Sequence, residues 1–487
     1  MGVGAIALLL LQWFLLKSVS LPGALSWEYM LLVLPLTIGV CYLVWLNEKI
    51  WTVMALLGHL FFMVAVKEGI GPNELAFSTI TLFGLGVWFI KEMGIERRRI
   101  VNSGFDLLLF SFVIGSTITT LIANRLYHGN MLDYTREWFT TFDLLFYFPL
   151  KKMLQSRGDV KVLVGTFAAV GLVVGFNSIL TYRERLVNSV YEYQITSSRV
   201  FANETTAMLF LLMFAVLFAY SQGVFGRLFS FTGMGLGALF LGISFARGAI
   251  VTGILGLFIL AVILPFKRGR RVVVALFGSI IAIVLVLLVA MPTMVGNFSR
   301  AMEARIATVA SAGKDQSFSA RTIESAVVLR HVAQNPLLGY GYGVLFKHTD
   351  PLTHKTGMQG YIHNGYVRPL YKFGIPMALL VYLMMIYPLV RLAVRHPNRR
   401  EEPFLWGIAA GGASYLLAVI VLNYSTEVFS VFWSVLNFAV VWAALEYVNT
   451  ELKRREIVRL PDDPAVDPVV DIDRAELDGA AMAKGDG

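Results

Sequence analysis

Charged residues and cysteines are scarce in this sequence. Of its 487 residues only 15% are charged, whereas 57% are hydrophobic, and soluble proteins carry about 25% charged residues. A soluble globular domain is therefore excluded, and lipid must solvate much of the chain. The single cysteine, Cys41, lies inside an apolar run, which excludes an intrachain disulfide and a thiolate metal cluster.

Motifs for nucleotide and metal chemistry are also missing. The sequence has no GxxxxGK[ST] loop, and the glycines of 339–343 neither form GxGxxG nor follow a strand. No HExxH motif and no carboxylate cluster predicts zinc or magnesium. Asp471-Ile-Asp473 resembles the DxD of metal-dependent glycosyltransferases, but we interpret it as part of an acidic tail. We expect neither a metal nor a nucleotide cofactor.

Long apolar runs dominate what remains. A helix of roughly 20 residues crosses a bilayer and satisfies its own backbone groups, so the sequence predicts an all-α polytopic membrane protein. About fourteen runs qualify as candidate spans, and twelve is the alternative because several are short. The runs lie near 2–20, 28–46, 51–66, 75–90, 103–122, 138–150, 162–180, 204–220, 228–246, 248–265, 272–291, 364–390, 404–422 and 429–447.

The net charge of +9 reflects topology and not nucleic-acid binding, because Lys and Arg form short clusters between the spans. The clusters are Lys91–Arg99, Lys151–Lys152, Lys267–Arg271, Arg391–Arg400 and Lys453–Arg455. They fall on one face when the spans alternate, and the positive-inside rule makes that face cytoplasmic. We expect both termini there, with the first apolar run retained as a span.

The apolar pattern divides the chain into four parts. Residues 1–291 form an N-terminal transmembrane bundle, 292–363 a large and partly helical periplasmic loop, 364–450 the last spans, and 451–487 a disordered cytoplasmic tail. Within the loop, the apolar spacing from Ser319 predicts a helix that ends at Gln334, before Asn335-Pro336. A glycine-rich turn follows at 338–343.

Arg247 is the first candidate site residue. The apolar stretch 228–265 is about 57 Å long as one helix, which exceeds a ~30 Å membrane core. It must therefore break, and Ala246-Arg247-Gly248 is the natural place. Arg247 at this hairpin tip either snorkels to a headgroup or binds an anionic group at the membrane surface.

Arg321 and His363 are the other two candidates. Arg321 lies at the start of the loop helix, where the helix dipole disfavours a cation, so it is either a solvated arginine, a partner of Glu324, or a ligand of an anion. His363 lies where the polar loop meets a span and is either structural or suited to proton transfer near neutral pH. Asn364 and Tyr366 could orient it or bind hydroxyls. Guanidinium groups hold phosphate oxygens bidentately, so the set predicts a lipid-linked pyrophosphate site.

Four motifs, in order, carry a resemblance to a known family. They are Ser244-Phe-Ala-Arg-Gly-Ala249, Ser319-Ala-Arg321, Asn335-Pro-Leu-Leu-Gly-Tyr-Gly341, and His363-Asn-Gly-Tyr366 leading to Phe373-Gly-Ile-Pro376. Together they resemble the O-antigen ligase and polymerase superfamily over about 200–390. Many members have paired histidines before the asparagine, whereas this chain has Ile362-His363.

The resemblance implies a GT-C-type bundle in the inner membrane of a Gram-negative bacterium. It implies transfer of an O-antigen glycan from undecaprenyl pyrophosphate to a hydroxyl of lipid A–core, without metal or nucleotide. Arg247 and Arg321 would bind the pyrophosphate, and His363 would deprotonate or orient the acceptor. The expected substrate-binding residues are Asn203, Arg300, Arg305, His331, Tyr340, Asn364 and Tyr366.

Other functions stay open on the sequence alone. An O-antigen polymerase or a protein-O-oligosaccharyltransferase would use the same residues with another acceptor. A transporter or flippase of lipid-linked glycans is an alternative from a different class, but the sequence lacks a recognisable inverted repeat and several charged residues within spans.

Overall fold

The computed structural model describes most of the helical part of the chain. The described residues are 27–62, 72–187, 204–244, 246–290, 292, 295–296, 299–300, 303, 316–349, 356–429 and 432–459. Most of them are helical, and the one sheet within these ranges is a two-stranded hairpin. The all-α prediction is confirmed.

The first half of the fold is a set of helices of uneven length. They are α2 (Trp27–Leu46), α3 (Glu48–Phe62), α4 (Pro72–Phe89) with a π-helical turn (Ile90–Ile95), α5 (Gly104–Leu126), α6 (Met131–Phe142), a 3-10 turn (Asp143–Phe146), α7 (Tyr147–Met153) and α8 (Arg157–Val187). The expected span 138–150 is wrong as a single helix, because the 3-10 turn divides it between α6 and α7.

The second half contains the segments predicted to carry the site. They are α10 (Glu204–Tyr220), α11 (Val224–Ile243), α12 (Arg247–Ile263), α13 (Phe266–Ala290), α15 (Gln316–Gln334), β1 (Phe346–Thr349), β2 (Thr356–Gln359), α16 (Val367–Val394), α17 (Pro403–Leu422) and α18 (Phe432–Arg459). The predicted break before Arg247 and the predicted end of the loop helix at Gln334 are both confirmed. α18 continues to Arg459, so the predicted tail begins later than residue 451.

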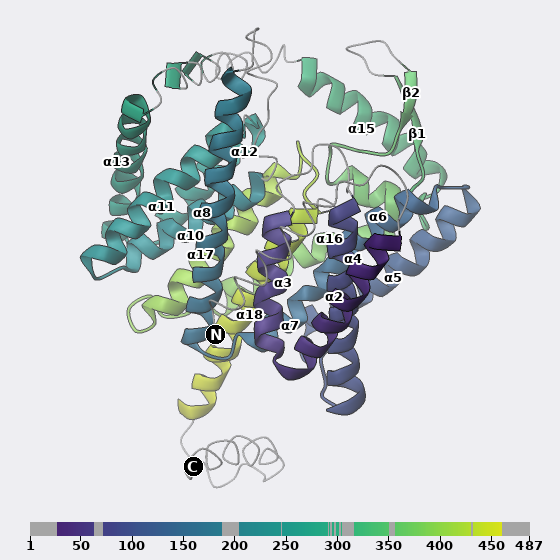
Figure 1. Ribbon diagram of the computed structural model, residues 1–487, viewed down its shortest axis with the longest axis horizontal. Coiled ribbons are helices and arrows are strands. Elements are labelled where there is room, and N and C mark those ends of the chain that lie inside the picture. Colours follow the sequence, from purple (N-terminus) through teal and green to yellow (C-terminus); the bar gives the residue numbers. More distant parts are fainter. Residues whose placement is uncertain are drawn as a thin grey trace.

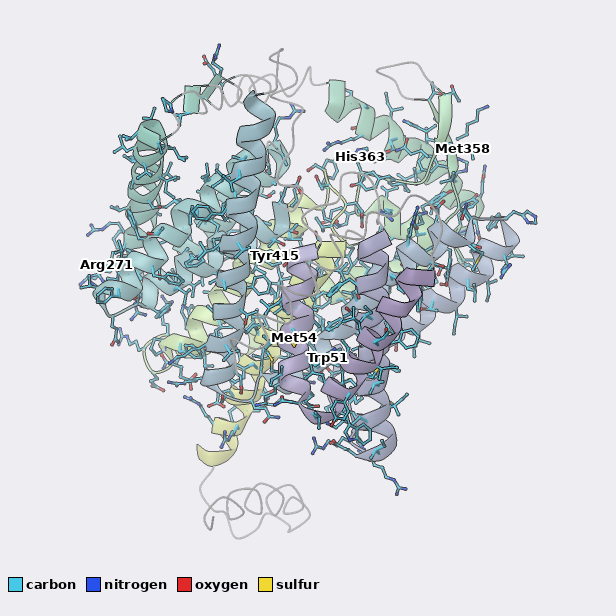
Figure 2. The ribbon with its side chains drawn as sticks, in the orientation of Figure 1. Trp51, Met54, Arg271, Met358, His363 and Tyr415 are labelled. Atoms are coloured by element: carbon cyan, nitrogen blue, oxygen red, sulfur yellow. The ribbon has the colours of Figure 1, made fainter. Side chains whose placement is uncertain are left out.

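Five described helices are long and apolar enough to cross a membrane, namely α5, α11, α13, α16 and α17. α10, α12 and the segment Pro35–Leu46 of α2 are shorter apolar helices. α13 leaves apolar side chains such as Phe277 and Ile281 exposed, as expected where lipid is the solvent. Trp51, Trp442 and Tyr415 are fully buried, and Figure 2 shows Trp51 and Tyr415 inside the bundle.

The two ends of the bundle differ in what they carry. α15 and the β1–β2 hairpin lie above the bundle in Figure 1, whereas the end of α18 lies at the bottom. We call the first the loop end. We call the opposite one the basic end, because the cations of α7, the end of α16 and the end of α18 lie there: Lys151, Lys152, Arg391 and Arg455.

Local sequence explains how α5 begins at the basic end. Ser103 is a capping residue whose hydroxyl accepts from the backbone of Asp106 at 3.2 Å, and Asp106 accepts from the backbone of Ser103 at 2.9 Å. This reciprocal capping box satisfies N–H groups that the helix start leaves unpaired. Asp106 also binds Lys151 at 2.6 Å, which ties the start of α5 to α7.

The glycine-rich turn and α16 interlock at the loop end. α16 is unwound at Gly374, where φ is 72°, and a Cβ there would lie 2.2 Å from the carbonyl oxygen of Leu337. The amide of Tyr340 donates to the Tyr371 carbonyl at 2.7 Å, one of the carbonyls that the unwinding releases. The expected span 364–390 is therefore two helical pieces, and the first of them belongs to the loop end.

Candidate active site

His363 and Glu324 form the centre of the candidate site. Nδ1 of His363 lies 3.1 and 3.2 Å from the two carboxylate oxygens of Glu324, and the backbone N–H of His363 donates to Glu324 at 3.0 Å. The Glu324 side chain is 3% exposed, whereas that of His363 is 41% exposed. Figure 2 shows His363 at the loop end, beside the hairpin that carries Met358. The structure thus holds a half-exposed imidazole on a buried carboxylate.

The protonation of Glu324 follows from its neighbours. Burial acts to raise the pKa of its carboxyl, but the hydrogen bonds and charge of His363, together with a hydrogen bond from Gln359, bring it below the usual value. An ionised carboxylate only accepts hydrogen bonds, so Nδ1 of His363 carries the proton. Nε2 faces away from Glu324, and among the described residues no group hydrogen-bonds to it. A histidine oriented in this way is suited to act as a general base.

Gln359, the last residue of β2, holds the carboxylate from the other side. Its amide nitrogen donates to Glu324 and to the carbonyl oxygen of Tyr361. The hairpin is therefore linked directly to the His363–Glu324 pair. Sequence reasoning missed Gln359, because nothing in a polar loop distinguishes one glutamine from another.

Tyr361 connects His363 to a buried ion pair. Its ring stands edge-on to His363 with centroids 4.9 Å apart, and the Arg368 guanidinium lies 5.8 Å from the same ring. Arg368 is paired with Glu427 at 2.8 Å, and both are buried. Desolvation raises the pKa of the Tyr361 hydroxyl and Glu427 adds to this, while Arg368 and, less strongly, Arg321 partly offset it. Tyr361 therefore lies within the electrostatic reach of both Arg321 and Glu427.

The connection 423–428 between α17 and α18 contacts the segments that carry the two predicted arginines. Arg321 donates to the carbonyl oxygen of Ser425 at 2.5 Å. Gly248, next to Arg247, packs against the same residue, since a Cβ at Gly248 would lie 2.7 Å from the Ser425 hydroxyl. Both arginines are partly buried. The segments that carry Arg247 and Arg321 thus meet at Ser425, as the hypothesis of a shared anion site requires.

The same connection also holds the segment that carries His363. The amide of Gly365 donates to the Asn423 carbonyl at 2.8 Å, and the amide of Val428 donates to the Asn423 side chain at 3.2 Å. Glu427 adds its ion pair to Arg368. Residues 423–428 therefore contact the segments of the histidine and of both arginines.

Arg321 differs in position from what the sequence predicted. α15 begins at Gln316 and not at Ser319, so Arg321 lies beyond the first turn, where the helix dipole has less effect. Glu324, which was considered as its partner, is instead bound by His363 and Gln359. The signal that could have found this pairing is the apolar face of α15, which places Glu324 one turn before the buried Val328.

Asn364 and Tyr366 make contacts with the protein itself. The Asn364 side chain accepts from the amides of Tyr366 and Val367 at 2.9 and 3.3 Å, which caps the start of α16. The Tyr366 hydroxyl donates to the Ile420 carbonyl. These contacts fix the backbone next to His363. The role of both residues in substrate binding stays a prediction.

His331 and Tyr340 lie in a separate aromatic cluster. Tyr340 stacks on Tyr371 with centroids 4.8 Å apart, and His331 stands edge-on to Tyr340 at 5.8 Å. His331 lies two turns after Glu324 on α15, which is about 10 Å along the helix axis. The structure therefore does not bring these two residues together with His363.

Three candidates remain, and the structure describes one of them. Arg300 is exposed, whereas Asn203 and Arg305 lie outside the described residues. Within the described ranges no group of three or more His, Cys, Asp and Glu side chains is arranged to hold a metal ion.

The fold and the site together define a polytopic α-helical membrane protein with the His363–Glu324 pair where a polar loop meets the bundle. Residues 232–383 match the family model described as O-antigen ligase. This match confirms the resemblance and assigns the region to the O-antigen ligase family, which indicates an enzyme of the ligase or polymerase type. It includes Arg247, Arg321, Glu324 and His363, but not the connection 423–428. No curated protein matches the chain.

Proposed function

We propose that this protein is a glycosyltransferase that moves an O-antigen glycan from undecaprenyl pyrophosphate to a sugar hydroxyl of lipid A–core. The pairing of His363 with the buried Glu324 is the observation that carries the proposal. It lies within the region matched by the family, at the end of the bundle where a membrane-held donor would present its pyrophosphate. The loop end is then periplasmic, and the basic end faces the cytoplasm across the inner membrane.

The reaction needs one proton acceptor and a stabilised leaving group. Nε2 of His363 takes the proton of the acceptor hydroxyl. The oxygen of that hydroxyl then attacks the anomeric carbon of the donor sugar. The bond from that carbon to the pyrophosphate oxygen breaks, and the pyrophosphate leaves with the electron pair. Glu324 stabilises the imidazolium that forms. One displacement of this kind inverts the anomeric centre.

Arg247 and Arg321 supply the charge stabilisation. A departing pyrophosphate gains negative charge, and preorganised cations lower the barrier most where that charge develops. The shared contact of their segments with Ser425 fits this role, because it fixes the two segments relative to one another. In this proposal arginine does the work that a metal ion does in other phosphate-transferring sites, and no nucleotide takes part.

Reconstitution tests the proposal directly. The purified protein is mixed with an undecaprenyl-pyrophosphate glycan and lipid A–core, with a chelator and without nucleotide. Joined product is expected from the wild-type protein, and a loss of about a hundredfold or more from Glu324→Gln, because the neutral amide no longer stabilises the imidazolium. Near-normal product from Glu324→Gln would contradict the assigned role of the pair.

The same experiment separates the alternatives. Elongated lipid-linked glycan would identify an O-antigen polymerase, and a glycosylated protein acceptor would identify a protein-O-oligosaccharyltransferase. Movement of the donor across the membrane without covalent change would favour a transporter. No separate observation in the structure favours any of these three.

A further inference from the structure

Tyr220 joins three segments at the basic end. It is the last residue of α10, and its ring packs on the backbone of α17, since a Cβ at Gly407 would lie 3.0 Å from the ring. The Arg268 guanidinium of α13 lies over the same ring, 4.4 Å from its centroid. Arg268 and Arg399, which precedes α17, both act electrostatically on the Tyr220 hydroxyl. Two cations from distant parts of the sequence are thus gathered around one side chain.

Trp406 adds a second aromatic surface to this group. The guanidinium of Arg399 lies 5.4 Å from the centroid of its ring, and the buried indole N–H has no hydrogen-bond partner within the described part of the chain. An indole N–H only donates, and so does a guanidinium. The cluster of Tyr220, Arg268, Arg399 and Trp406 therefore contains N–H donors that a bound anion could pair with.

No carboxylate of the described residues provides an acceptor for these donors. Neither Arg268 nor Arg399 forms an ion pair with any described residue, in contrast to Arg391 and Arg455 at the same end. Glu402, the nearby carboxylate at the start of α17, is already paired with Arg455 at 2.7 Å. Two like charges held together cost free energy, and an anion between them would offset that cost. A guanidinium whose face covers a ring keeps its N–H edge available for such an anion.

We propose that this cluster binds the phosphate headgroup of an anionic phospholipid. The cluster lies at the ends of membrane helices, where basic pockets between helices bind lipid phosphates. α13 faces lipid on the opposite side from Arg268, where Val274 and Phe277 are apolar and exposed. A lipid headgroup at this end of the helix therefore lies within reach of the cluster, and the test below separates it from a free phosphate.

The test compares lipids and matched variants of the full-length protein. Purified protein is titrated with phosphatidylglycerol or phosphatidylcholine, and bound lipid is measured by native mass spectrometry. We expect preference for phosphatidylglycerol, and a loss of about thirtyfold in its affinity when both cations are removed in Arg268→Gln with Arg399→Gln. The matched control is Arg270→Gln with Arg400→Gln, which removes two exposed cations of the same segments and should bind like the wild type.

Further arms keep the result unambiguous. The thermal unfolding of each variant in detergent alone shows whether it is folded, and Trp406→Phe keeps the ring but removes the N–H, so a smaller loss is expected. Equal binding of the two lipids, or equal loss in the control pair, would overturn the proposal. Binding of inorganic phosphate as tight as that of phosphatidylglycerol would also overturn it, because the lipid would then contribute nothing beyond its phosphate.

Discussion

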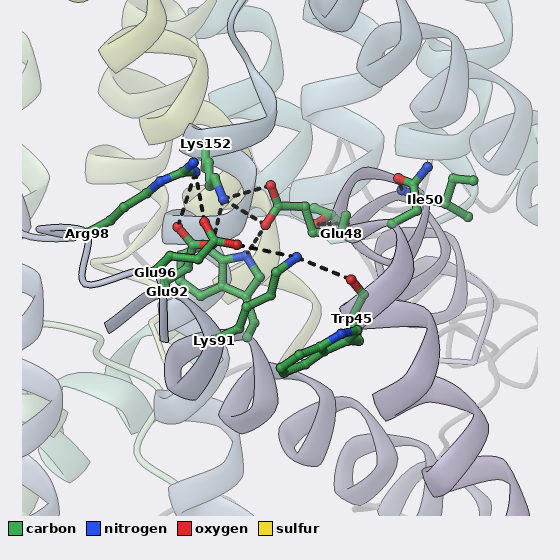
Figure 3. Close-up of polar contacts among 11 residues, drawn as sticks. Trp45, Glu48, Ile50, Lys91, Glu92, Glu96, Arg98 and Lys152 are labelled. Carbon is green, nitrogen blue, oxygen red and sulfur yellow. Dashed lines mark hydrogen bonds and ion pairs between the residues drawn. The ribbon is translucent and has the colours of Figure 1, made fainter. Parts of the chain in front are cut away.

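The two ends of the bundle hold their buried carboxylates in different ways. At the basic end Lys152 lies 2.5 Å from Glu92 and 2.8 Å from Glu48, and Trp88 donates to Glu48 at 3.2 Å (Figure 3). At the loop end the buried Glu324 is bound by His363, whose ring is half exposed. The first cluster is closed on itself, whereas the second keeps one nitrogen open to a ligand.

This difference predicts that the cluster at the basic end stabilises the fold, whereas the pair at the loop end serves the reaction. The Lys152 cluster joins α3, the π-helical turn after α4, and α7 through one cation that two carboxylates share, with Arg98 3.9 Å from Glu92 as a second cation. A buried charge that loses its partner is strongly destabilising. The Glu324 pair links α15 to the segment before α16, and its hydrogen bonds set the orientation of an exposed base. Substitutions in the two clusters should therefore change different measured quantities.

The largest expected effect is on turnover at the loop end. Replacement of His363 by Gln removes the proton acceptor, and we expect a loss of about 10²–10⁴-fold in glycan transfer per folded molecule. Thermal unfolding should change less, because Glu324 keeps its bonds from Gln359 and from the backbone of residue 363. The measurement is product formation in the reconstituted assay. His128→Asn is the control, because His128 is exposed and has φ of 53°, a backbone conformation that asparagine tolerates. Transfer at the wild-type rate by His363→Gln would contradict the role of His363 as the proton acceptor.

The next effect is on stability at the basic end. Lys152→Met leaves Glu92 and Glu48 without their shared cation, and we expect a loss of about 3–5 kcal/mol in the free energy of unfolding. Turnover per folded molecule should stay unchanged. Lys49→Met is the matched control, since its pair with Asp159 spans 3.3 Å and is partly exposed, where such pairs contribute at most about 1 kcal/mol. Chemical denaturation in detergent measures both, and equal losses would show that burial of the cluster is unimportant.

A third prediction concerns the interlock that carries the loop end. Gly374→Ala places a Cβ at positive φ, close to the Leu337 carbonyl, so we expect a loss of at least about 1–3 kcal/mol in stability. Turnover should fall as well, because the first piece of α16 follows directly on His363. Gly86→Ala is the control, since a Cβ at Gly86 meets nothing within 4 Å and should be neutral or stabilising in a helix. A thermally unchanged Gly374→Ala protein would mean that the unwound turn is not needed.

Local rules predicted those features of the fold that local sequence determines. The break at Arg247 followed from a length that one span cannot have, and the end of α15 followed from Asn335-Pro336. The unwound turn in α16 was missed because hydropathy runs on across Phe373-Gly-Ile-Pro376. The division of 138–150 was missed for the same reason, since an apolar composition does not separate one helix from two short ones.

The candidate site was only half predictable, because its contacts join distant residues. His363 and Arg321 were identified from their position at the membrane boundary and from the family resemblance. Glu324 lies 39 residues before His363, and no periodicity links two such positions. Ser425 contributes a backbone carbonyl, which any residue has, so its role depends entirely on the packing of α12, α15 and α17.

The smallest expected effect is the pH dependence of the Glu324 contribution. The pKa of Glu324 lies below its usual value because His363 and Gln359 outweigh burial. A carboxyl with a lowered pKa in the folded state stabilises the fold above its unfolded value of about 4.3, and loses that contribution as the pH falls through the folded value. The difference in melting temperature between wild type and Glu324→Gln should therefore be present at about pH 5 and should shrink below about pH 4. Glu456→Gln, at an exposed pair with Arg395, should show no difference at any pH. If the difference in melting temperature stayed the same below about pH 4, the charge of Glu324 would not stabilise its pair with His363. The loop end would then differ from the basic end only in how exposed its charged groups are.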